Sequence, residues 1–126
     1  MHVCLVSPQV PVITSPAPVR VLFIGGDERQ ARCDERVRML LCRWYPWVEV
    51  RFIHTGWSGN WGKQAVQIAR LIPEYDAVVV MRFIRTKLGE YIRRAAGRSQ
   101  KPWHACTGRG PEAIVNSIAA AWRLVN

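Results

Sequence analysis

The stretch Val19-Arg-Val-Leu-Phe-Ile-Gly-Gly26 decides the fold of this chain. A mostly apolar run that ends in two glycines is typical of a buried strand in a parallel sheet, followed by a tight turn. Two further runs have the same character, Val48–Ile53 and Asp76–Met81, and Trp103–Cys106 predicts a short fourth strand. The sequence therefore predicts four buried strands.

A helix is expected after each strand, over residues 28–44, 60–72, 86–96 and 111–125. The first shows apolar residues at helical spacing from Cys33 to Trp44, and Thr86 is expected to cap the third. Strands that alternate with helices predict a parallel sheet with right-handed crossovers.

The expected fold class is α/β. It is a single Rossmann-like or flavodoxin-like domain over residues 19–126, with a four-stranded parallel sheet in the order 2-1-3-4 and helices on both faces. Residues 1–18 contain four prolines and no Lys, Arg, Asp or Glu, so we expect an irregular N-terminal arm there.

The chain is strongly basic. Its 126 residues carry a net charge of +9, and 15 of its 18 basic residues are arginine. Between Arg82 and Arg109 there are eight basic residues and one acid. Such a balance favours nucleic acid, phosphate-rich ligands or an acidic protein as partner, although a high-GC genome also enriches arginine.

The four cysteines, Cys4, Cys33, Cys42 and Cys106, have neither close CxxC pairing nor zinc-ligand spacing. They are interpreted as reduced thiols of a cytoplasmic protein. No run reaches the ~18 apolar residues of a membrane span, so no membrane association is expected. The N-terminal segment lacks the basic residues that begin a signal peptide.

The loops that leave the strands hold the candidate site, because the carboxyl edge of an open parallel sheet is where ligands bind. Candidate anion-binding residues are Arg82, Arg85, Thr86, Thr107, Gly108, Arg109 and Gly110. Candidate stacking or partner-contact residues are Trp57, Asn60 and Trp61, and the loop glycines are Gly25 and Gly26. Glycine loops before helices offer backbone N–H groups to an anion.

Each of these assignments has an alternative. Arg82 and Arg85 could clamp one phosphate, or pair with Asp27 and Glu28 across the crevice. The two loop tryptophans could stack on bases, anchor a partner, or fold back on the core. A phosphatase-like loop after Cys106 is excluded, because its arginine would have to stand six positions on and that position is glutamate.

No catalytic residue is assigned. His54 is a weak candidate for a general base, since a histidine at a strand end is more often structural. The sequence shows no paired carboxylates, no triad and no metal-ligand cluster, so neither a metal nor a cofactor is expected and an enzyme is not favoured.

The runs Val21-Leu-Phe-Ile-Gly-Gly26 and Asp76-Ala-Val-Val-Val80, followed by a basic helix and Lys101-Pro-Trp103, resemble the bacterial family called domain of unknown function 2325. The resemblance covers about residues 19–122. It implies a compact Rossmann-like domain and supplies no established activity. Members of that family tend to have Ser-His near the start of the third helix, where this chain has Arg85-Thr86.

The sequence thus predicts a small basic binding module without catalytic function. It would be an accessory subunit that holds an anionic partner, above all nucleic acid, within a larger assembly, together with a protein partner or further copies of itself. The first alternative is an enzyme or sensor acting on a nucleotide or phosphorylated metabolite in the crevice at the carboxyl edge. The second is a structural adaptor for an acidic protein.

Overall fold

A computed structural model describes residues 17–57, 59–82 and 84–125. Its strands are β1 (Val19–Ile24), β2 (Val48–Ile53), β3 (Ala77–Met81) and β4 (Trp103–Cys106). Its helices are α1 (Glu28–Ala31), α2 (Asp34–Trp44), α3 (Trp61–Leu71), α4 (Thr86–Arg98) and α5 (Pro111–Arg123), with a short 3-10 helix, η2 (Ile72–Glu74).

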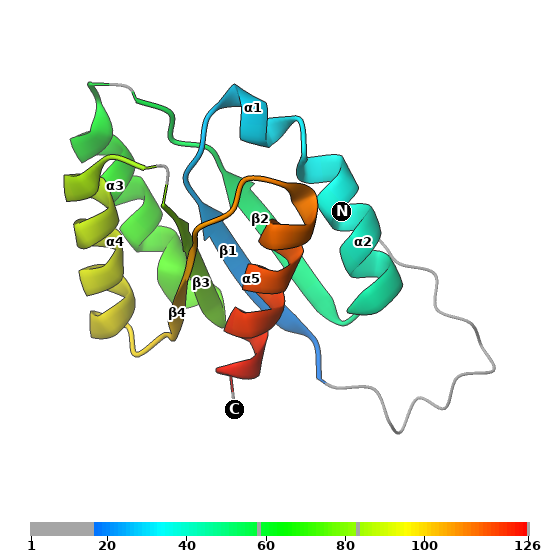
Figure 1. The fold of residues 1–126 in the computed structure, drawn as a ribbon. Coiled ribbons are helices and arrows are strands. Elements are labelled where there is room, and N and C mark those ends of the chain that lie inside the picture. Colours follow the sequence, from blue (N-terminus) through cyan, green and yellow to red (C-terminus); the bar gives the residue numbers. More distant parts are fainter. Residues whose placement is uncertain (1–16, 58, 83, 126) are drawn as a thin grey trace.

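The strands form one all-parallel sheet in the order β2-β1-β3-β4, which confirms the predicted fold class and strand order (Figure 1). The first described strand, β1, begins at Val19. The predicted irregular arm lies almost wholly outside the described residues. No helix in the described part of the chain is both long and apolar enough to cross a bilayer.

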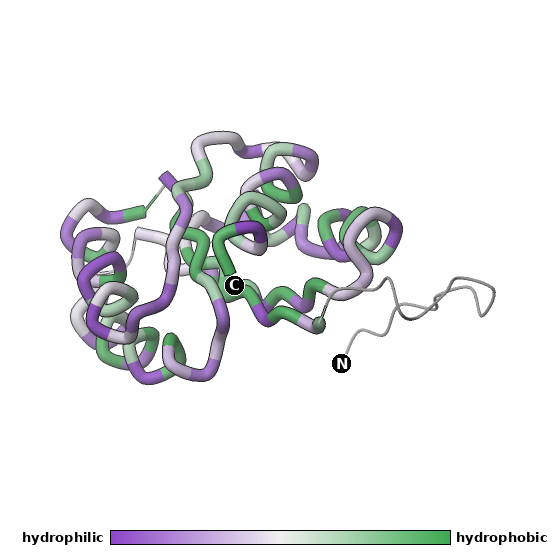
Figure 2. The backbone as a smooth tube through the Cα atoms, turned by 90° about the horizontal axis from the view of Figure 1, so that it is seen from below, coloured by the Kyte–Doolittle hydropathy of each residue, from purple (hydrophilic) through white to green (hydrophobic). Residues whose placement is uncertain are grey.

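Alternate residues of the central strands feed two separate cores. Val21 and Phe23 of β1 pack with α2 and α5 on one face, whereas Leu22 and Ile24 pack with α3 and α4 on the other. All four are fully buried, as expected for a central parallel strand covered by helices on both faces. Figure 2 shows the hydrophobic strands in the middle and hydrophilic stretches on the outer helices.

The two glycines after β1 are required by the backbone and by close packing. Gly25 and Gly26 have φ angles of +121° and +81°, which residues with a Cβ rarely adopt. A Cβ at Gly25 would lie 2.8 Å from the Cβ of Met81, and one at Gly26 would lie 2.9 Å from the Cβ of Gln30. The pair therefore makes the tight turn that brings the end of β1 against β3.

The first predicted helix is wrong as a continuous element, because it is divided into α1 and α2. Asp27 caps α1 through a reciprocal capping box with Gln30, and this short helix buries only that glutamine. The second helix starts at Asp34, where the apolar positions Val37 and Leu41 turn toward the core. Helix α2 is stabilised by packing its apolar side chains on the sheet, and α1 has no apolar side chain that packs there.

Two helix ends of the basic segment also differ from prediction. Arg85 occupies the capping position of α4, so Thr86 is the first helical residue and not the cap. The helix continues past Gly97 to Arg98. Buried Ala95 and Ala96 pack against the sheet there, and this packing outweighs the helix-ending preference of glycine.

The cysteines differ in state. Cys33 and Cys106 are free thiols, whereas Cys42 is disulfide-bonded. The expectation of reduced thiols is therefore wrong at Cys42, and Cys4 lies outside the described residues.

Candidate functional site

Backbone hydrogen bonds join the loops at the carboxyl edge of the sheet. The Gly56 N–H donates to the Gly26 carbonyl at 2.9 Å, which links the loops after β1 and β2. The Arg82 N–H donates to the Cys106 carbonyl at 2.8 Å, which links the loops after β3 and β4. The four exits therefore form two tied pairs along one edge, as the topology requires.

The side chain of Arg85 connects these two pairs. Its Nη2 donates a hydrogen bond to the backbone carbonyl of Trp57 at 2.7 Å. Within residues 17–57, 59–82 and 84–125, no ion pair joins Arg82 or Arg85 to Asp27 or Glu28. The alternative that these arginines pair with the two acids across the crevice is therefore wrong. Arg85 holds a loop, whereas the Arg82 side chain is exposed.

Trp57 stands in a small basic hollow. Its side chain is 57% exposed, and it lines a cavity of about 120 Å³ together with Asp27, Arg29, Gln30 and Arg109. The Asp27 carboxylate accepts a hydrogen bond from the Arg29 N–H at 2.9 Å as the cap of α1. Two guanidinium groups and an exposed indole thus come to one place from the connections that follow β1, β2 and β4.

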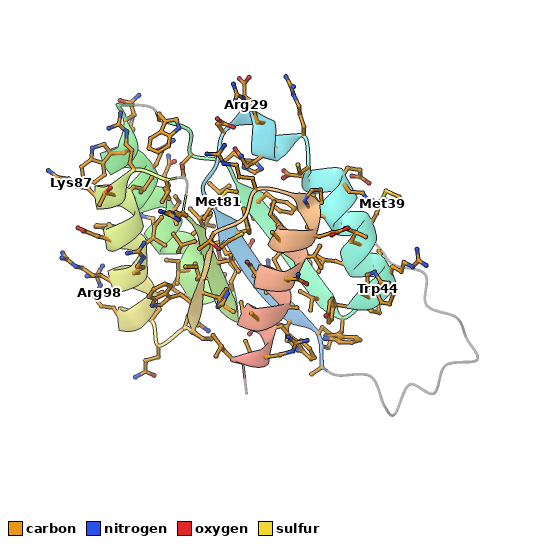
Figure 3. The ribbon with its side chains drawn as sticks, viewed as in Figure 1. Arg29, Met39, Trp44, Met81, Lys87 and Arg98 are labelled. Atoms are coloured by element: carbon orange, nitrogen blue, oxygen red, sulfur yellow. The ribbon has the colours of Figure 1, made fainter. Side chains whose placement is uncertain are left out.

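Arg29 is not among the site residues expected from the sequence. It lies on α1, in the connection between β1 and α2. Figure 3 shows Arg29 on α1, projecting beyond the edge of the sheet.

The structure separates the other predicted residues. Thr86, Thr107 and Arg109 are exposed at the edge, and Asn60 is the capping residue of α3 without a side-chain capping bond. Trp61 packs partly buried against the core beneath α3 and α4. Of the two loop tryptophans, therefore, Trp57 presents an open ring and Trp61 is largely a core residue.

The two glycines of the loop after β4 differ in their surroundings. A Cβ at Gly108 would overlap the Cβ of Ala113 on α5, so packing alone accounts for this glycine. A Cβ at Gly110 would meet nothing within 4 Å. Gly110 is the capping residue of α5 and Pro111 follows it, which leaves this helix start open to solvent.

His54 lies between two acceptors. Its Nδ1 is 3.0 Å from the Gly25 carbonyl, and its Nε2 is 2.8 Å from the Asp34 carboxylate. Its ring also stacks on Phe52 with a centroid distance of 5.9 Å. Because both nitrogens are engaged, neither is open to a substrate in this arrangement, and the histidine ties β2 to β1 and α2.

A second hollow, of about 420 Å³, lies under α1. It is lined by Asp27, Glu28, Arg29, Ala31, His54, Thr55 and Gly56. The Thr55 hydroxyl is buried without a hydrogen-bond partner among the described residues. No group of three or more His, Cys, Asp or Glu side chains in that part of the chain could hold a metal ion.

The structure is a Rossmann-like α/β domain with arginines and an exposed tryptophan at the carboxyl edge of its sheet. No protein-family model, curated protein or solved structure matches the chain. The resemblance to domain of unknown function 2325 therefore stays a prediction, and function has to be argued from the residues.

Proposed function

We propose that this domain is a non-catalytic module that binds nucleic acid at the carboxyl edge of its sheet, as an accessory part of a larger assembly. The observation that carries the proposal is Trp57, an exposed indole that lines one hollow together with Arg29 and Arg109. An aromatic ring beside cationic groups suits a base and its adjoining phosphates.

The surrounding charges support a polyanion. Arg82 is exposed on the loop after β3, and Arg85 is close enough to Trp57 to bond its carbonyl. Arginine contacts phosphate through a planar fork of donors, which suits a ligand with several phosphates. The start of α5, beside Gly110, has no side-chain capping bond and adds a positive dipole end to the same edge.

A small phosphorylated ligand is less well served. The hollow of about 420 Å³ under α1 is large enough for one, but it is lined by two carboxylates and one guanidinium, whereas the hollow at Trp57 is lined by one carboxylate and two guanidinium groups. Two carboxylates repel a phosphate. The engaged ring of His54 supplies no free base for an enzyme there.

The test is binding of a fluorescent 20-nucleotide single strand, followed by anisotropy at several salt concentrations. Affinity should fall with salt, with a logarithmic slope of about 0.7 per phosphate contacted. Trp57→Ala should weaken binding by about 1–3 kcal/mol, the value of one base–aromatic stack. Arg82→Ala should lower the salt slope by about 0.7.

Trp44→Ala is the matched control, because Trp44 is 60% exposed but lies on α2. It should leave binding unchanged. The proposal is refuted if no oligonucleotide binds at low salt, or if Trp44→Ala weakens binding as much as Trp57→Ala. A rise in Tm with one particular mononucleotide, and none with the oligonucleotide, would favour the small-ligand alternative.

A further inference from the structure

The outer side of α4 carries a line of cationic side chains. Lys87, Arg94 and Arg98 are all exposed, and their spacings of seven and four residues place them on one side of the helix. Figure 3 shows Lys87 and Arg98 projecting away from the sheet at opposite ends of α4. At 1.5 Å per residue the line is about 16 Å long.

Aromatic rings accompany this line. The Arg98 guanidinium lies 5.9 Å from the centroid of Tyr91, and the Arg93 guanidinium lies 5.3 Å from the centroid of Trp103 on β4. Trp103 is 40% exposed, because it belongs to an edge strand of the sheet. Glu90 is the one acid in the α4 sequence. Tyr91 is partly buried against the core, so the surface offers positive charge beside one exposed aromatic ring, that of Trp103.

This surface continues from the edge of the sheet. The helix starts at Thr86, directly after the loop that contains Arg82 and Arg85. The hollow around Trp57 is too small, at about 120 Å³, to use the charges of α4 as well. A ligand that met both would have to be extended.

We propose that the outer face of α4 is the second half of a track for an extended single strand of nucleic acid, which begins at Trp57. The proposal rests on the proposed function and adds its partner class and path. About 16 Å corresponds to roughly five phosphates at ~3.4 Å per nucleotide in a stacked strand. Exposed rings favour unpaired bases, because the bases of a duplex are already stacked on one another.

The experiment compares two labelled oligonucleotides, dT5 and dT20, on one pair of double variants. Arg94→Ala with Arg98→Ala should weaken dT20 binding at least tenfold and lower its salt slope by about 1.4, for two lost contacts. Binding of dT5 should stay within twofold, because the edge site alone accommodates it. Both positions are exposed, and thermal melts should match the unmodified protein.

Arg36→Ala with Arg43→Ala is the matched control, since it removes the same charge from exposed positions on α2. The track is refuted if this control weakens dT20 equally, if the α4 variant weakens dT5 and dT20 alike, or if it weakens neither. Tighter binding of a 20-base-pair duplex, or of polyglutamate, than of dT20 would also overturn it. A separate result would refute the proposed site at Trp57 itself: Trp57→Ala would leave dT5 binding unchanged.

Discussion

The two helical layers of this domain are built alike inside and differ outside. Helices α3 and α4 carry six basic residues and one acid, whereas α2 and α5 carry four basic residues and three acids. Ile92 of α4 and Ile118 of α5 are both fully buried beneath them. The concentration of positive charge on one layer is therefore not a requirement of the fold, which the other layer meets without it.

The layer formed by α2 and α5 exposes apolar surface instead. A hollow of about 310 Å³ lies there, lined by Leu40, Trp44, Tyr45, Glu112, Val115 and Asn116. Below it, Tyr45, Trp47 and Trp122 form an aromatic cluster with centroid distances between 5.2 and 6.0 Å. The concentrated positive charge and this hollow thus lie on different sides of one sheet.

The largest expected effect is on the free energy of unfolding, when a fully buried isoleucine is truncated in either helical layer. Ile92→Ala and Ile118→Ala should each lower the free energy of unfolding by about 2–5 kcal/mol, because each leaves a cavity in a closed core. Urea unfolding measures both. If one variant costs less than about 1 kcal/mol, the two layers are not equivalent inside, and the comparison has to be restated.

Gly25 tests the place where the layers meet. A Cβ there would lie 2.8 Å from the Met81 Cβ in one core and 3.5 Å from the Ile84 Cβ in the other, at a φ of +121°. Gly25→Ala should cost about 2–4 kcal/mol from strain and overlap, measured by urea unfolding. Gly59→Ala, where a Cβ meets nothing within 4 Å, should change stability by less than about 1 kcal/mol.

His54 stabilises only one layer, and its effect should be the smallest of the three. His54→Ala removes contacts to Asp34 and Gly25 and should cost about 2 kcal/mol, because charged or buried hydrogen-bonding groups lose their partner. A double-mutant cycle with Asp34→Ala isolates the pair. A coupling energy near zero would show that the ring is held by Phe52 and not by Asp34.

The strands and the loops at the carboxyl edge of the sheet could be predicted because both follow from patterns local to the chain. An apolar run ending in Gly25-Gly26 specifies a buried strand and its turn without knowledge of anything else. Such local patterns do not show that Trp57 is exposed whereas Trp61 packs on the core. Nor do they show that Arg29 lines the same hollow as Trp57. Which tryptophan faces solvent depends on the core beneath α3, to which residues far along the chain contribute.

The same limit explains the other differences. The chain breaks between α1 and α2 because α2 packs an apolar face on the sheet, whereas α1 has no apolar face. The pairing of His54 with Asp34 joins residues 20 positions apart. Contacts of this kind are set by the packed structure and leave no periodic trace in the sequence.

The hydrogen bond from Arg85 to the Trp57 carbonyl has a consequence for affinity. The 2.7 Å contact restrains the backbone at Trp57 before any ligand arrives. Part of the conformational entropy at this position is therefore given up on folding, which would lower the entropic cost of the proposed stacking on Trp57. In the proposed complex Arg85 would contribute by limiting backbone motion, whether or not its own guanidinium touches a phosphate.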